Sequence, residues 1–510
     1  MTSLWRADGA VVAGSPFQPG QHRDVIVVGA GITGLSTALQ LVREGLDVAV
    51  VEAGEVGNLA TGGNTGKLSL LQGKVLSTLR RHHPAALVRA YVDANRDGAR
   101  WLTDFADEAG VAYTRRTAYT YAQSDAGIHD VDAEFAAAHE AGLAVRRELP
   151  DEAGRFPIVD AVALDDQVAI DPQEVTLALA RAFLAAGGTL HTGTRVLHVS
   201  VLPRTVVETT AGFASARQVV LATAAPITYR GFYFVKTRGL RSYCVAFDVP
   251  GEVPDGLYLS VDGPTRSLRS VTSADGPAEL ARLVVGGNGH SVGRAESERA
   301  LVDDLIDWTR RNFPGAEPQL SWSAQDYESH DLIPFVGPMP RSLGKIRFAT
   351  GFGKWGLSNG PAAALGLTAE IMRVPSSDRP EWMSTIAHRL TVPADFGRGG
   401  VENIHVGWEA TAGWVGAQFA PVPVVQPEEG QGVVATRGGH PIGISTVGGT
   451  TRAVSLVCTH LGGVPSWNDA ECTWDCPLHA SRFAPDGTRI EGPALRDLAR
   501  LPRSGPPTDR

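Results

Sequence analysis

The N-terminal region alternates short apolar runs with longer stretches in which apolar residues recur at helical spacing. Residues 24–28 and 47–51 are almost continuous runs of valine, isoleucine and alanine after an aspartate, as in strands buried on both faces of a parallel sheet. Residues 35–46, between them, place apolar side chains three and four positions apart, which predicts a helix. The same period follows Asp171-Pro172, a helix-start signal. This order predicts an α/β domain.

Farther along the chain the pattern favours strands. Between residues 231 and 330 the apolar runs LRSYCVAFDV, LYLSV, RSLRSV and LARLVVGG predict a sheet, and Gly286–His290 (GGNGH) is interpreted as a turn. From about residue 427, the runs GVVATR, HPIGIST and TRAVSLV are separated by glycine-rich turns, which predicts a small antiparallel domain. Residues 376–425, with proline-rich ends, are interpreted as a bridging linker.

The turn after the first predicted strand carries a nucleotide-binding signature. Residues 29–34 read G-A-G-I-T-G between a strand and a helix, and Glu52 ends the next strand. Gly29 permits the tight turn, Gly31 lets the backbone approach a pyrophosphate at the helix N-terminus, and Gly34 lets helix and strand pack. Glu52 is expected to accept hydrogen bonds from the adenosine ribose. The motif alone does not distinguish NAD from FAD.

Two further glycine-rich loops decide between these cofactors. Residues 61–69 (TGGNTGKLS) and 351–361 (GFGKWGLSNGP) resemble the flavin-contacting loops of the D-amino-acid oxidase-like FAD-dependent oxidoreductases. The resemblance implies FAD, and a helix that starts soon after Pro361 and points its positive end at the flavin ring. Together with Gly29, Gly31, Gly34 and Glu52, the cofactor-binding residues that it implies are Thr61, Gly62, Asn64, Thr65, Lys67, Val196, Thr223, Gly353, Lys354 and Trp355.

Lys67 and Lys354 lie in these two loops, although the chain has only five lysines. One interpretation is an ordinary surface lysine. The other is a cation near the flavin that tunes its electronic properties, and Lys354 is the better candidate for this role.

Near the C-terminus, Cys458, His460, Cys476 and His479 form a candidate metal site. Two thiolates and two imidazoles suit a structural zinc ion or a Rieske [2Fe-2S] cluster. Pro477 inside the second pair favours a tight loop over the helix of a zinc finger. The surrounding sequence resembles the two cluster-binding loops of Rieske domains, C-T-H-L-G and W-x-C-P-x-H-x-S-x-F. The resemblance implies that these four residues hold the cluster.

The chain departs from the high-potential Rieske proteins of respiratory chains. Gly463 and Leu478 stand where those proteins carry a disulfide, so none is expected here. Ser481 is placed to donate a hydrogen bond toward a cluster sulfur, but Phe483 cannot donate one. We therefore expect a reduction potential in the lower part of the Rieske range of roughly −150 to +300 mV. Cys244 and Cys472 are interpreted as reduced thiols, with Cys472 an alternative to Cys476 as a ligand.

Composition and charge narrow the possible partners and the cellular compartment of the protein. The net charge of −9 gives no case for nucleic-acid binding. No run of 18 apolar residues and no signal peptide is apparent, so no membrane span is expected. Four cysteines in 510 residues fit a reducing cytoplasm.

The expected fold is an α/β Rossmann-like FAD-binding domain with an interleaved α+β substrate domain, plus a C-terminal all-β Rieske domain. The FAD-dependent oxidoreductase is expected over residues 1–375 and the Rieske domain over residues 426–510. Within the first, the FAD-binding part is expected at about 22–80, 155–230 and 330–375, and the substrate part at about 81–154 and 231–330.

A flavin and a Rieske cluster in one chain predict an enzyme that oxidises a small molecule, an amine or amino acid, by hydride transfer to FAD. Electrons would then leave singly through the cluster to an external acceptor that the sequence does not identify. No catalytic residue is assigned, and Arg241, Tyr243, Tyr327 and His330 are candidate substrate contacts. The alternatives are an electron-transfer module fed by a partner protein or NAD(P)H, and a redox sensor. A Rieske oxygenase is disfavoured, because about 31 residues after His479 leave no room for its iron domain.

Overall fold

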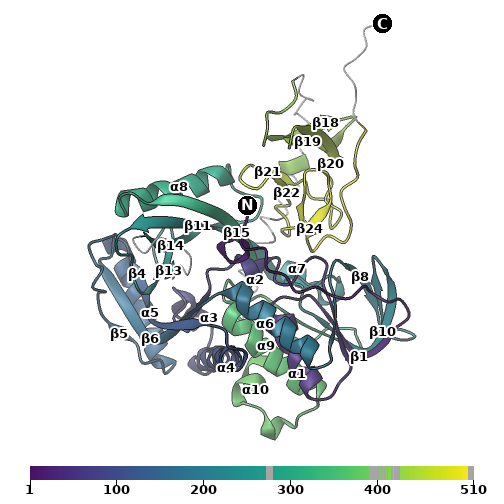
Figure 1. Ribbon diagram of the computed structural model, residues 1–510, viewed down its shortest axis with the longest axis horizontal. Helices are drawn as coiled ribbons and strands as arrows, with labels where there is room; N and C mark the ends of the chain where they lie inside the picture. Colours follow the sequence, from purple (N-terminus) through teal and green to yellow (C-terminus); the bar gives the residue numbers. More distant parts are fainter. Residues whose placement is uncertain are drawn as a thin grey trace.

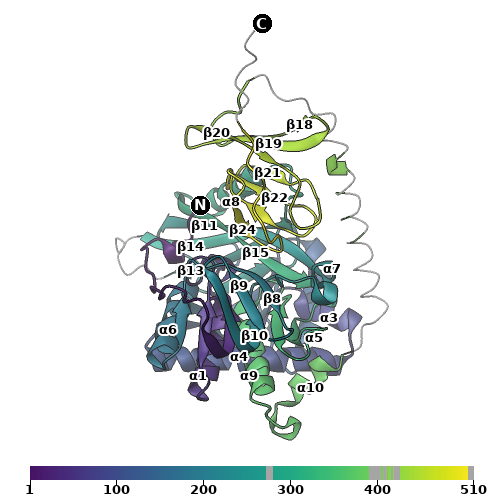
Figure 2. The same cartoon turned by 90° about the vertical axis from the view of Figure 1, so that its right-hand side faces the viewer.

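The computed structural model describes residues 1–271, 280–389, 403, 406, 409, 412–414, 417 and 425–502. Two large sheets stand side by side, and a small β-domain lies over the ends of β11 and β15 (Figures 1 and 2). No helix in these described ranges is both long enough and apolar enough to cross a membrane.

The first sheet confirms the α/β prediction. Its central strand β1 lies between β10 and β2, and all three are parallel. The strand order is β16-β17-β10-β1-β2-β7, and β9 and β8 extend it from β10. The strands are β1 (His22–Val28), β2 (Val48–Val51), β7 (Thr189–His191), β8 (Val196–Ser200), β9 (Val206–Thr209), β10 (Gly212–Leu221), β16 (Phe335–Pro338) and β17 (Ile346–Thr350).

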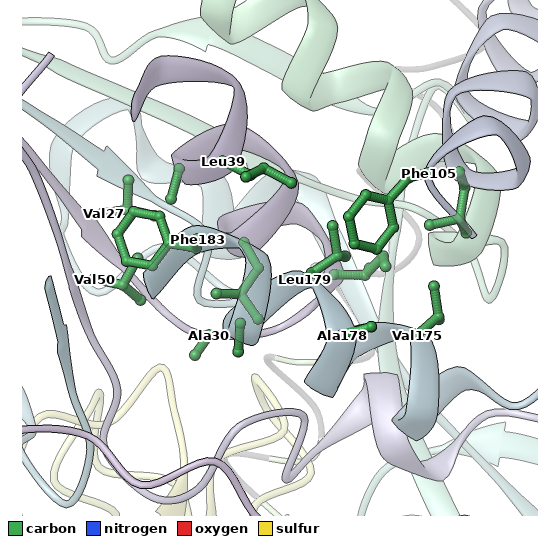
Figure 3. Close-up of a cluster of buried hydrophobic side chains, with 14 of the residues drawn as sticks. Val27, Ala30, Leu39, Val50, Phe105, Val175, Ala178, Leu179 and Phe183 are labelled. Atoms are coloured by element: carbon green, nitrogen blue, oxygen red, sulfur yellow. The ribbon is translucent and has the colours of Figure 1, made fainter. Parts of the chain in front are cut away.

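Helices pack on this sheet through a continuous apolar core. Val27 and Val50 of the strands contact Leu39 and Phe183 of the helices that cover them (Figure 3). Asp171 caps α6 by accepting hydrogen bonds from the backbone N–H groups of Gln173 and Glu174, as its sequence signal predicts. The helices in contact here are α1 (Ile32–Arg43), α4 (Ala85–Ala109), α6 (Pro172–Ala185) and α9 (Gly356–Ile371).

The start of α9 corrects one expectation. The helix begins at Gly356, before Pro361 rather than after it, and Pro361 lies inside it. Gly356 lies at the wall of the large cavity described below, so the N-terminal end of this helix does face that cavity.

The second sheet has the order β15-β11-β14-β13-β12-β4-β6-β3, with β5 paired to β6. All four strands predicted between residues 231 and 330 are present in it. Its strands are β3 (Lys67–Leu68), β4 (Tyr113–Ala122), β5 (Arg146–Arg147), β6 (Asp160–Ile170), β11 (Thr237–Pro250), β12 (Leu257–Ser260), β13 (Arg266–Val271), β14 (Leu280–Ser291) and β15 (Glu317–Ser329). The remaining helices include α2 (Ala60–Gly63), α3 (Val75–His82), α5 (Ile128–Glu140), α7 (Tyr233–Lys236), α8 (Glu298–Asn312) and α10 (Glu381–Ala387).

Two predictions in this region were wrong. β6 belongs to the second sheet, although the FAD-binding part was expected to resume at about residue 155; the chain returns to the first sheet's layer only after Ile170. Gly286–His290 is not a turn but the end of β14, paired with β11 across a bulge. Glycine is needed there for close approach, because a Cβ at Gly287 would overlap the Thr265 carbonyl oxygen.

The C-terminal domain is all-β, as predicted. Its three antiparallel strands β18, β19 and β20 match the predicted runs, and a second sheet has the order β21-β22-β23-β24. These strands are β18 (Gly432–Arg437), β19 (His440–Val447), β20 (Thr450–Ser455), β21 (Ser466–Asn468), β22 (Thr473–Asp475), β23 (Arg482–Phe483) and β24 (Arg489–Glu491). Most of the predicted linker, and residues 503–510, lie outside the described residues.

Candidate functional site

A cavity of about 680 Å³ opens between the two large sheets. Most of the residues predicted to bind a cofactor line it, although they come from six separate segments of the chain. They are Gly29, Gly31, Glu52, Thr61, Asn64, Thr65, Lys67, Val196, Thr223, Gly353, Lys354 and Trp355. Gly34 and Gly62 stand behind this wall, next to residues that line it.

The turn between β1 and α1 explains why its three glycines differ in role. Gly29 has a φ of 105°, and a Cβ there would press on the Ala222 carbonyl oxygen. A Cβ on Gly34 would overlap the Gly29 carbonyl oxygen, so Gly34 lets the helix pack on the turn. Gly31 is the N-cap of α1 and faces the cavity, which leaves the N–H groups at the helix start near the open space.

Glu52 is held rigidly at the end of β2. One carboxylate oxygen accepts a hydrogen bond from Ala30 N and the other from Gly54 N, both at 2.8 Å. A carboxylate has about four lone-pair sites, so further acceptor capacity remains on the side that lines the cavity. This geometry suits recognition of a ribose diol.

The two loop lysines differ in exposure, because Lys67 is 8% exposed whereas Lys354 is exposed at the cavity wall. Lys67 Nζ donates to the Tyr258 carbonyl oxygen at 2.7 Å and to Ser267 Oγ at 2.5 Å. Burial, with the nearby Arg269 charge, lowers the pKa of Lys67 to about 7. Lys354 has a φ of 75°, and its backbone N–H donates to Asp326 at 2.5 Å. Burial also lowers the pKa of Lys354. Both side chains line the cavity.

The predicted metal ligands lie on two matching tight loops of the C-terminal domain. Cys458 N donates to Gly463 O at 2.8 Å, and Cys476 N donates to Ser481 O at 2.8 Å. The same two cysteines accept, through their carbonyl oxygens, from Gly462 N at 2.9 Å and Ala480 N at 3.0 Å. Each loop therefore closes on its own cysteine, which fixes the direction of both thiols.

The ligands form a cysteine pair and a histidine pair. The Cys458 and Cys476 side chains are within hydrogen-bonding reach of each other, and the imidazole centroids of His460 and His479 are 4.9 Å apart. His460 Nδ1 is buried and has no hydrogen-bond partner, so it is free to bind a metal. In the described part of the chain, no three His, Cys, Asp or Glu side chains form a single-ion site. Two pairs suit a Rieske cluster better than one zinc ion.

The surroundings of the pairs agree with this assignment. Burial lowers the pKa of His460 to about 4 and that of His479 to about 3, so both imidazoles are neutral, as ligands must be. Cys472 points its sulfur at the Gly430 carbonyl oxygen, 3.8 Å away, so it does not replace Cys476. Leu478 fills the space beside Gly463.

Comparison with known proteins identifies the two domains in which these sites lie. The sequence model of the family described as FAD dependent oxidoreductase (DAO) matches residues 24–370. The chain belongs to this family. The model of the Rieske [2Fe-2S] domain matches residues 420–502, so the chain carries a Rieske domain as well. The first domain binds FAD and the second binds a [2Fe-2S] cluster.

Individual relatives match either nearly the whole chain or about seven-tenths of it. YhfW of Bacillus subtilis (strain 168), named as a Rieske 2Fe-2S iron-sulfur protein, is 27% identical over 98% of this chain and 97% of its own length. Glycine oxidase of Bacillus licheniformis is 27% identical over 71% of this chain and 95% of its own. The structure of glycine oxidase from Geobacillus kaustophilus shares the fold over 73% of this chain and 100% of its own, with a TM-score of 0.60 at 19% identity.

Of the four candidate substrate contacts, Tyr243 alone is among the described residues that line the FAD cavity. Arg241 is 1% exposed and donates to Glu471 of the Rieske domain at 2.9 Å, so it holds the domains together. Tyr243 lines the FAD cavity but its hydroxyl accepts from Asn468 of the Rieske domain. Tyr327 also points its hydroxyl at the Rieske domain, and His330 is absent from the described lining of the FAD cavity.

Other charged side chains line the FAD cavity that the sequence did not single out. Arg238 and Glu328 form an ion pair at 3.1 Å on its wall. Cys244 also lines it, and burial raises the pKa of this thiol to about 12, so it stays protonated. Neither Arg238 nor Glu328 belongs to a sequence motif, so only the pairing of β11 with β15 reveals them.

The cluster ligands are covered by the flavin-binding part of the chain. Tyr229 stacks on His460 with ring centroids 5.4 Å apart, and its hydroxyl donates to the His460 carbonyl oxygen. Phe234 meets both ligand rings edge-on, at 4.9 Å from His460 and 5.1 Å from His479. The two histidine ligands of the cluster site therefore pack against residues that lie outside the Rieske domain.

Proposed function

We propose that the protein oxidises a small amine or amino acid at FAD and passes the electrons singly through its Rieske cluster to an external acceptor. Bound FAD supplies two-electron chemistry and a Rieske cluster supplies one-electron transfer. The proposed enzyme is a dehydrogenase that carries FAD and the Rieske cluster in one chain.

One side chain carries this proposal, because it belongs to both sites. Gln325 lines the FAD cavity, and its Nε2 donates to the Ala480 carbonyl oxygen at 2.8 Å, one residue after the ligand His479. The same Nε2 donates to Tyr327 Oη at 3.1 Å, and Tyr327 in turn donates to the Gly492 carbonyl oxygen at 3.1 Å. The FAD cavity and the histidine loop of the cluster thus share a wall of hydrogen-bonded side chains.

The amine or amino-acid substrate class is supported by relatives and by the cavity. Two of the relatives above are glycine oxidases. The Arg238–Glu328 pair places both signs of charge on the cavity wall, as a zwitterionic substrate would require. Removal of a hydride next to an amine needs no strong protein base, and we assign none.

Anaerobic mixing with a panel of amines and amino acids tests this function. We expect at least one member to bleach the flavin absorption, followed by reduction of the cluster. Bleaching by NAD(P)H alone, or by a reduced partner protein alone, would contradict the proposal and favour an electron-transfer module. The same spectra, with iron and sulfide analysis, report both cofactors.

Lys354 is expected to tune the flavin. Replacing it with methionine should lower the flavin reduction potential and slow flavin reduction by roughly tenfold, or about 1.4 kcal/mol, because a cation on the wall of the flavin cavity favours an electron-rich ring. Lys345→Met is the matched control, because Lys345 is exposed and is not among the described residues that line the cavity. A potential and a rate unchanged in Lys354→Met would rule out the role.

A further inference from the structure

The Rieske domain contributes one strand to the wall of the FAD cavity. Arg489, Ile490, Glu491 and Gly492, on and just after β24, line this cavity. β24 lies at the edge of the domain that faces the flavin-binding part (Figure 2). The cavity is therefore incomplete without the Rieske domain.

Arg489 is the cationic member of this strand, which also carries the carboxylate of Glu491. It is 5% exposed, and its Nη1 donates to the Ala494 carbonyl oxygen. Its Nε is buried and has no hydrogen-bond partner. A buried donor without a partner is costly, and a ligand acceptor that reached it would remove this cost.

The charged groups around Arg489 also favour an anionic ligand at this position. Arg195 from the flavin-binding part donates to the Arg489 carbonyl oxygen at 3.3 Å and lines the same cavity. Burial and the Arg195 charge lower the pKa of Arg489 to about 10, against a weaker opposing effect of Asp497. Glu52 is near enough to Arg195 to raise its pKa against the effect of burial. The buried Arg489 and the partly buried Arg195 thus lie near Glu52, the carboxylate that suits the adenosine ribose.

We propose that the Rieske domain completes the FAD site, with Arg489 binding the adenosine-diphosphate half of FAD across the domain interface. The anionic pyrophosphate is the ligand that two neighbouring guanidinium groups would take. Because one ligand then contacts both domains, FAD binding and Rieske-domain docking stabilise each other. The inference concerns cofactor binding and is independent of the substrate.

Arg489→Gln tests the proposal, since it removes the charge but keeps a donor for Ala494. We expect the variant to bind FAD at least tenfold more weakly in a titration of the FAD-free protein, with iron and sulfide content unchanged. Arg500→Gln is the control, because Arg500 lies in the same domain but is exposed and pairs with Asp486. Unchanged FAD affinity in Arg489→Gln would overturn the proposal.

A second measurement covers the case in which Arg489→Gln fails to hold its cluster. In the wild-type protein, saturating FAD should raise the temperature at which the visible circular dichroism of the cluster is lost. Arg500→Gln should show the same rise. No rise in the wild-type protein would overturn the proposal, whatever the behaviour of the variant.

Discussion

Replacing Cys458 with alanine is expected to abolish the [2Fe-2S] cluster while leaving FAD bound. Its sulfur is one half of the cysteine pair, and its loop is closed by its own backbone hydrogen bonds. Without this thiolate, one iron keeps a single protein ligand, so iron and sulfide should fall from about two each per chain to near zero. The flavin absorption should remain, because Cys458 is not among the described residues that line the FAD cavity.

Cys472→Ala is the matched control for this prediction. Cys472 lies four residues before Cys476 in the chain, but its sulfur points at the Gly430 carbonyl oxygen. The variant should keep iron, sulfide and the electron paramagnetic resonance signal of a reduced Rieske centre. Loss of the cluster in Cys472→Ala, with retention in Cys476→Ala, would make Cys472 the ligand in place of Cys476.

The motifs could be predicted because their geometry is local. The contact of Gly34 with Gly29 and the hydrogen bonds that close the two cluster loops each span about five residues, so the spacing in sequence predicts the structure. Apolar runs predicted the strands for the same reason. The approach of Gly29 to Ala222 is the exception, because it joins distant parts of the chain. The interpretation of Gly286–His290 as a turn was wrong because glycine there permits close packing against Thr265. Only the pairing of β13 with β14 creates this contact.

The domain interface could not be predicted in this way. Arg241 meets Glu471 across 230 positions, and Gln325 meets Ala480 across 155. A charged residue in a strand can be either a substrate contact or a member of an ion pair. The sequence contains no pattern from which its ion-pair partner can be predicted. The assignment of Arg241 to the substrate failed for this reason. The part that β24 takes in the FAD cavity was missed for the same reason.

Replacing Arg241 with methionine is expected to destabilise the protein by roughly 3 kcal/mol, since removal of one cation from a buried charge cluster leaves the Glu471 carboxylate only partly compensated. Arg241 donates to Glu471 at 2.9 Å and to Gln325 at 2.7 Å, and its side chain is 1% exposed. Burial alone would raise the pKa of Glu471, but the charges of Arg482 and Arg241 lower it to about 2. Glu471 thus remains ionised at neutral pH and would keep only Arg482 as a close cationic partner.

Because the lost contact joins two domains, its removal should also reduce the cooperativity with which the two domains unfold. Urea unfolding followed by flavin fluorescence and by cluster absorption should give coincident transitions in the wild-type protein, and separate ones in Arg241→Met, with the Rieske domain unfolding first. Arg155→Met, which removes an exposed pair with Glu252, should cost less than about 1 kcal/mol and keep the transitions together. A shift of both transitions by the same amount in Arg241→Met would show that the two domains still unfold as one unit without this contact. Separation would instead identify the Arg241–Glu471 contact as the link that keeps the cluster against the wall of the FAD cavity.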